Sequence, residues 1–150
     1  MTDASAVFVD TNVLLTATSP RRALHTNALR VLNDWPNRGI PLCTSGQIMR
    51  EYLVVATRPT ALNGLGMGTP EALANANAIR SRMRFLNENR AVFARLSALL
   101  NDINCSGKNI HDANVVATAL SHGVQRILTS TIQDYERFVP GVELLGLPEG

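Results

Sequence analysis

The sequence predicts an α/β fold, a three-layer sandwich built around a mostly parallel sheet. Apolar runs short enough for single buried strands alternate with longer segments whose apolar residues recur at helical spacing. The strand-like runs are continuously apolar, as in strands that are covered on both faces. Strands that alternate with helices form parallel sheets through right-handed crossovers, so helices are expected on both sides of the sheet.

Start and stop signals justify the elements of the first half of the chain. The run at 6–10 ends in a Thr-Asn turn that can cap a helical turn. Pro36 stops the next helix, Ser45 can cap the one after it, and Pro59 lies beyond its end. The predicted elements here are a strand at 6–10, a helix at about 22–35, a strand at 41–44 and a helix at 46–57.

The second half begins with a glycine-rich loop at 58–69. Thr69 and Pro70 favour a helix start, and Gly123 favours a helix stop. The predicted elements are a helix at 69–87, a helix at about 91–101, a helix at 111–123, a strand at 126–131, a helical turn at 134–138 and a strand at 142–147.

Length and composition predict one domain over residues 1–150 with a sizeable core, since the chain is 45% hydrophobic and 17% charged. The first residues carry no basic region, and Asp10 interrupts the first apolar stretch. A signal peptide and a membrane span are therefore not expected. The sequence instead predicts a cytoplasmic protein. Cys43 and Cys105 lack metal-ligand spacing and are predicted to be small apolar fillers rather than a disulfide or a zinc half-site.

Four acidic residues carry the functional signal: Asp10, Glu51, Asp112 and Asp134 each follow a predicted strand or lie on the helix that a strand feeds. The carboxyl ends of parallel strands meet at one edge of the sheet, which is the usual ligand crevice. Two carboxylates about 4 Å apart repel by roughly 4 kcal/mol near a protein surface, so a cluster implies protonation or a bound cation. Mg²⁺ or Mn²⁺ is the cation that carboxylate ligands favour.

Each acid also has a structural interpretation. Asp10 and Asp134 can cap turns, and Asp112 lies in a first helical turn, where the helix dipole favours negative charge. Glu51 is predicted to lie beside an apolar helix stripe, so it needs a cation, a donor or a salt bridge to a distant arginine. The combination of the four favours a site.

Polar neighbours complete the candidate site. Asn12, Thr129 and Thr131 are predicted to support the acids or a ligand water by hydrogen bonds. His111 is interpreted as an incidental neighbour of Asp112, because adjacent helix residues point in different directions. No Ser-His-Asp or Cys-His set is evident, which disfavours covalent catalysis.

The four acidic segments together resemble the PIN domain. The matching motifs, in the family's order, are FVDTNVLL, TSGQIMREYL, IHDANVVATAL and ILTSTIQDYERF. The resemblance covers essentially the whole chain. A compact PIN domain that stands alone is similar to the VapC toxins of VapBC toxin–antitoxin pairs.

The resemblance implies five parallel strands, Mg²⁺ (or Mn²⁺) as cofactor, endonucleolytic RNA cleavage and inhibition by a cognate antitoxin. It assigns Asp10, Glu51 and Asp112 as metal-binding acids and Asp134 as a further catalytic acid. A homodimer is also expected. The family often has an aspartate or asparagine two residues after the strand threonine and then an Asp-Phe pair, whereas this chain has Thr131 and Asp134-Tyr135.

RNA binding has a weaker signal. The net charge is only +2, and Lys108 is the one lysine among arginines, which fork onto phosphates better than lysine does but also accumulate through codon bias. Arg80 and Arg84 are predicted to share a helix face that binds RNA or is simply solvated. The same helices offer apolar anchors for a dimer face or an antitoxin groove, namely Leu73, Ile79, Met83 and Leu86.

Three other classes compete with the nuclease. Phosphatases of the haloacid-dehalogenase type need a second aspartate where the chain has Asn12. A response-regulator receiver needs paired acids and a lysine near the chain end, and Lys108 is badly placed for that. An inactive PIN-like scaffold that only binds RNA or protein remains an alternative. A metal-dependent nuclease assay, compared with RNA binding in a chelator, distinguishes this scaffold from the enzyme.

Overall fold

Five parallel strands form one sheet in the computed structural model, which describes residues 3–148. The strand order is β3-β2-β1-β4-β5, and each neighbouring pair is parallel. The strands are β1 (Val7–Val9), β2 (Leu42–Ser45), β3 (Arg84–Leu86), β4 (Arg126–Leu128) and β5 (Glu143–Leu145). The predicted α/β class and the five-stranded parallel sheet are confirmed.

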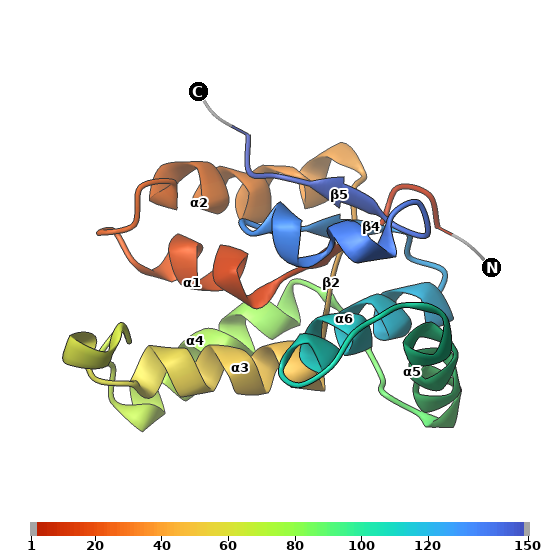
Figure 1. Ribbon diagram of the computed structural model, residues 1–150. Coiled ribbons are helices and arrows are strands. Elements are labelled where there is room, and N and C mark those ends of the chain that lie inside the picture. The colour runs from red at the N-terminus through yellow and green to blue at the C-terminus, as the bar shows by residue number, and fades with distance from the viewer. Residues whose placement is uncertain (1–2, 149–150) are drawn as a thin grey trace.

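Six α-helices flank the sheet within residues 3–148. In Figure 1, α1 and α2 lie above the other four helices, with the strands between the two groups. No helix in this part of the chain is long and apolar enough to cross a bilayer. The helices are α1 (Thr11–Thr18), α2 (His25–Asp34), α3 (Gly46–Thr57), α4 (Thr69–Ser81), α5 (Arg90–Asp102) and α6 (Asn109–Ser121), with 3₁₀ turns at Pro36–Arg38, Thr60–Leu62, Ile132–Asp134 and Glu136–Phe138.

The central strand β1 is the core of the molecule, and all three of its residues are fully buried. It pairs with β2 on one side and β4 on the other, and the chain leaves these neighbours in opposite directions across the sheet. The carboxyl end of β1 is therefore the point where the strand order reverses, and parallel sheets bind ligands at such points. Asp10 directly follows β1 at this end.

The helix predicted over 46–57 is confirmed as α3, and its predicted cap is present. The Ile48 backbone N–H donates to the Ser45 hydroxyl oxygen at 3.4 Å. This cap anchors the start of the helix that carries Glu51.

The helix predicted over 69–87 is wrong in its last third. Helix α4 ends at Ser81, and the chain then forms strand β3, whose backbone pairs with β2. Arg84 and Phe85 are exposed on this edge strand and only Leu86 is buried, so no apolar run marks the strand in the sequence. Pairing with β2 overrides the local helical preference.

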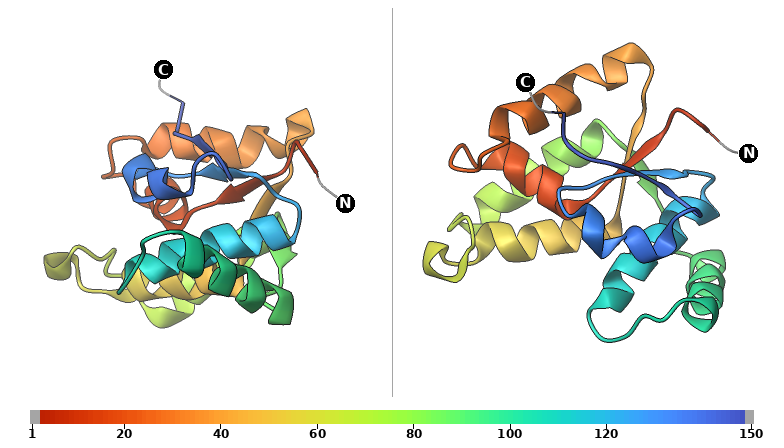
Figure 2. Two further views of the ribbon diagram at one scale, coloured as in Figure 1. Left: turned by 45° about the vertical axis from the view of Figure 1, so that its right-hand side comes forward. Right: turned by 45° about the horizontal axis from the view of Figure 1, so that its top comes forward.

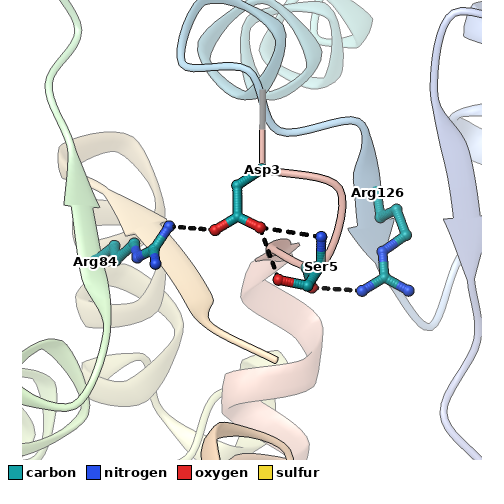
Figure 3. Close-up of polar contacts among 4 residues, drawn as sticks. All are labelled: Asp3, Ser5, Arg84 and Arg126. Atoms are coloured by element: carbon teal, nitrogen blue, oxygen red, sulfur yellow. Dashed lines mark hydrogen bonds and ion pairs between the residues drawn. The ribbon is translucent and has the colours of Figure 1, made fainter. Parts of the chain in front are cut away.

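Arg84 consequently does not share a helix face with Arg80. Its guanidinium pairs with Asp3 at 2.7 Å, and Asp3 also accepts the backbone N–H and hydroxyl of Ser5 (Figure 3). These Ser5 bonds and the Arg84 bond lower the pKa of Asp3 to about 2. Arg126 of β4 donates to the Ser5 carbonyl (Figure 3). The segment before β1 thus ties β3 to β4.

The loop after α3 folds back onto the end of that helix. The backbone N–H groups of Leu65 and Met67 donate to the carbonyls of Val55 and Ala56 at 3.1 and 2.9 Å. They satisfy carbonyl groups that a helix end otherwise leaves unpaired. The close approach depends on Gly64, where an added Cβ lies 2.0 Å from the Arg58 carbonyl oxygen.

Gly64→Ala is therefore expected to displace the loop and destabilise the domain. Overpacking of this kind costs about 1–3 kcal/mol, which lowers Tm by several degrees in a domain of this size. Thermal unfolding measures the effect, and Gly146→Ala is the control because its added Cβ is 3.5 Å from its nearest neighbour. Equal Tm values for the two variants contradict the packing described here.

Candidate active site

The four predicted acids, Asp10, Glu51, Asp112 and Asp134, line one pocket of about 540 Å³. They come from four different segments: the end of β1, the middle of α3, the first turn of α6 and the 3₁₀ turn after β4. The fold therefore brings together side chains that lie far apart in the sequence.

Asp10 is the most buried of the four, with 7% of its surface exposed. Its Oδ1 accepts the Thr11 backbone N–H at 2.8 Å, which makes it the N-cap of α1, and its Oδ2 accepts the Thr129 hydroxyl at 2.8 Å. Burial raises its pKa, while these two donors oppose the rise and the charge of Glu51 adds to it. Asp10 thus has the structural cap role and also faces the pocket.

The three predicted supporting residues meet around Asp10. The Thr129 hydroxyl accepts the Thr131 backbone N–H at 3.1 Å and the Asn12 side-chain amide at 3.3 Å, so its single proton is left to point at Asp10. Asn12 also donates to the Thr131 hydroxyl at 3.1 Å and accepts the Ser130 backbone N–H at 3.0 Å. This cluster fixes the direction of one lone pair on Asp10.

Glu51 is held by two neutral donors. The Thr11 hydroxyl donates to Oε1 at 2.8 Å, and the Gln47 side-chain amide donates to Oε2 at 2.9 Å. Within residues 3–148 Glu51 forms no ion pair, so the salt bridge to a distant arginine is absent there. Its negative charge therefore remains available to the pocket.

Asp112 carries the clearest sign of an uncompensated charge. Its pKa rises to about 6, first because of burial and then because of the charges of Asp10, Asp134 and Glu51. Arg137 opposes the rise but does not cancel it. Asp134 is exposed at the rim of the pocket.

Tyr135 places a further donor near the acids. Its ring is buried, and its hydroxyl lies close enough to Asp10 to lower the pKa of that carboxyl, although it makes no hydrogen bond of standard geometry within the described residues. Burial and the charges of Asp10 and Asp112 raise its pKa, so the hydroxyl stays protonated beside them. A buried donor without a partner is costly unless a ligand or water accepts from it.

The acids do not form a ready-made metal cage. Within residues 3–148, no group of three or more His, Cys, Asp and Glu side chains is close enough to hold a metal ion by itself. Mg²⁺ usually keeps several waters and takes only one or two carboxylates. The charged, donor-rich pocket therefore fits a hydrated divalent cation.

Sequence reasoning missed several residues of this pocket. Gln47 was detectable, because it lies one helical turn before Glu51 on the same face. Arg50 and Arg58 also line the pocket. Nothing in the sequence marks Asn114, which donates to Gln47 across the space between two helices.

Comparison with known families decides the classification. The sequence matches the PIN domain over residues 7–130, a span that includes Asp10, Glu51 and Asp112. The chain belongs to the PIN domain family. No curated protein matches this PIN domain by sequence.

Solved structures share the fold at low identity. VapBC2 from Rickettsia felis, bound to a promoter DNA fragment, gives a TM-score of 0.70 at 13% identity, covering 95% of this chain and 99% of that one. VapBC-1 from nontypeable Haemophilus influenzae gives 0.68 at 17%, covering 96% and 99%. VapC20 from Mycobacterium tuberculosis, a sarcin-ricin loop cleaving toxin, gives 0.61 at 21%, covering 81% and 86%. These likenesses establish the fold.

The raised pKa of Asp112 predicts a pH-dependent stability. The carboxyl binds its proton more tightly in the native state, so without metal the free energy of unfolding falls as pH rises from about 4 to about 6 and stays reduced above. Asp112→Asn removes this loss. It is expected to add about 1 kcal/mol at neutral pH, after a discount for solvent screening, and little at about pH 4.

Urea unfolding in a chelator measures both values, and Glu143→Gln, an exposed acid on β5, is the control. A variant that is less stable than the wild type at neutral pH contradicts the proposed cost of ionising Asp112 in this half-buried, acidic pocket.

Proposed function

We propose that this PIN domain is a Mg²⁺-dependent endoribonuclease that hydrolyses RNA phosphodiester bonds as the toxin of a type II toxin–antitoxin pair. The observation that carries the proposal is the meeting of four carboxylates in one pocket at the carboxyl end of β1. Membership of the PIN family and the likeness to VapC structures support it.

Asp10 and Asp112 are the residues proposed to hold the cation, with Glu51 binding it directly or through water. Mn²⁺ suits the same oxygen ligands. When bound, such a cation lowers the pKa of a water and offsets negative charge at the scissile phosphate. The protein's part is orientation: Thr129 and Thr11 fix the two oxygens of Asp10, and Asp134 extends the acidic rim.

The RNA path is proposed to follow two arginines that line the pocket, one on α3 and one directly after its last residue. The side chains of Arg50 and Arg58 form no ion pair or hydrogen bond within residues 3–148. They lie two helical turns apart, roughly 12 Å along the axis, with exposed Val54 between them. Their charges suit phosphates on either side of a cleavage point, whereas Arg84 is already paired with Asp3.

A cognate antitoxin and a second copy of the chain are the proposed protein partners. The likeness to the VapBC structures from Rickettsia felis and Haemophilus influenzae supports the first. The expected row of anchors does not form one helix face, because α4 ends at Ser81 and Leu86 is buried in β3. Leu73 is 48% exposed and remains the best placed of the four for a protein contact.

Asp10→Asn and Asp112→Asn are each expected to lower Mg²⁺-stimulated RNA cleavage by at least about 100-fold, because each removes a proposed cation ligand. Cleavage of a fluorescent RNA pool, with and without chelator, measures this. Glu143→Gln serves as the matched control, since it removes an exposed carboxylate outside the pocket.

Full cleavage by a folded Asp10→Asn variant rejects the assignment of the site. RNA binding without cleavage by the wild-type protein at any Mg²⁺ or Mn²⁺ concentration favours the inactive scaffold instead.

The arginine path makes a separate prediction. Replacing Arg50 and Arg58 with alanine is expected to weaken RNA binding in a chelator about 10-fold and to reduce the salt dependence of log K by about 0.7 per arginine. Arg80→Ala with Arg84→Ala is the comparison, because neither residue lines the pocket. If only this second pair weakens binding, the RNA runs along the originally predicted surface.

A further inference from the structure

Gln47 is the most deeply buried side chain of the pocket whose role the acids do not explain. It is the second residue of α3, and only 3% of its surface is exposed. A buried primary amide is costly unless its donors and its acceptor are all paired. The partners of Gln47 therefore show what its position is for.

The Gln47 amide is fully paired, and its orientation is determined. Its nitrogen donates to Glu51 Oε2 and to the His111 carbonyl, both at 2.9 Å, while its oxygen accepts the Asn114 amide at 2.8 Å. Rotating the amide by half a turn places its oxygen against a carboxylate and a carbonyl, which are both acceptors. The nitrogen therefore faces Glu51.

Further hydrogen bonds with Asn114 and Glu88 hold Gln47 itself in place. Asn114 of α6 also donates to Glu88 Oε1 at 2.8 Å, and Glu88 Oε2 accepts the Gln47 backbone N–H at 3.0 Å. The result is a closed ring of Gln47, Asn114 and Glu88 that joins the start of α3, helix α6 and the connection between β3 and α5. The amino-terminal ends of α3 and α6 come together in Figures 1 and 2.

The ring determines the orientation of the Glu51 carboxylate toward the pocket. Thr11 and Gln47 each donate to a different oxygen of Glu51, so the plane of the carboxylate is fixed. Without Gln47, Oε2 has no donor in the described residues, and the carboxylate is held only through the Thr11 hydroxyl, so its plane is no longer fixed. Hydrogen-bond partners of ligating carboxylates typically tune metal affinity or activity by about 10- to 100-fold.

We propose that Gln47 is a positioning residue for Glu51, and that Asn114 and Glu88 hold its amide in the donating orientation. The proposal rests on the proposed function, because it gives Glu51 a role toward the divalent cation. The site described so far consists of four acids and their direct donors. The proposal adds Gln47, Asn114 and Glu88 to it as residues that orient Glu51.

The experiment is a double-mutant cycle between Gln47→Met and Glu51→Gln, since Met keeps the length of the side chain but cannot donate or accept as an amide does. The readouts are Mn²⁺ affinity by electron paramagnetic resonance without RNA, and kcat and KM for RNA cleavage. Gln47→Met is expected to weaken Mn²⁺ binding or kcat about 10-fold or more with KM within about 2-fold. In the Glu51→Gln background it is expected to have no further effect.

Two further variants keep the result decisive. Asn114→Ala leaves Gln47 in place but releases its amide, so it is expected to give a smaller loss in the same direction, even if Gln47→Met fails to fold. Thr118→Val removes a different buried hydrogen bond on α6, to the Asn114 carbonyl, and is expected to leave both readouts unchanged.

The proposal is overturned if the effects of Gln47→Met and Glu51→Gln multiply in the double variant. It is also overturned if folded Gln47→Met and Asn114→Ala both keep the wild-type Mn²⁺ affinity and kcat. If the wild-type protein cleaves no RNA, the proposed function fails, while the Mn²⁺ affinities still test the role of Gln47.

Discussion

The cost of burying several carboxylates together at the end of β1 is the constraint on which the site depends. Asp10, Glu51 and Asp112 line one pocket, and burial with neighbouring charge raises the pKa of Asp10 and Asp112. The protein meets this cost with neutral donors such as Thr129 rather than with arginine ion pairs. Neutral donors orient a carboxylate without neutralising it, so the pocket keeps its negative charge.

The parallel sheet makes this arrangement rigid. Asp10 is tied to β4 through Thr129 and to α1 through the Thr11 backbone, while the Thr11 hydroxyl reaches Glu51 on α3. A single residue after β1, Thr11, thus donates to two of the acids. Because β1 is fully buried, the register of the site is set by the core rather than by a loop. Gln47 connects these hydrogen bonds to α6, because its amide donates to the His111 carbonyl.

The sequence was sufficient wherever a local pattern carried the information. Continuous apolar runs predicted β1, β2, β4 and β5, and the acids were recognisable because each follows a strand or lies on the helix after one. Strand β3 was missed, since its pairing with β2 leaves two of its three side chains exposed. That error also hid Glu88, and with it the ring around Gln47. Contacts between helices, such as the one from Asn114, have no sequence period that reveals them.

The acidic pocket is proposed to be a divalent-cation site. A crystal soaked in Mn²⁺ tests it most directly through anomalous scattering. An anomalous peak is expected between the carboxylates of Asp10 and Asp112, within about 2.0–2.6 Å of an oxygen of each or of the waters they hold. A well-ordered pocket without such a peak, or with Asp112 turned away from Asp10, contradicts it.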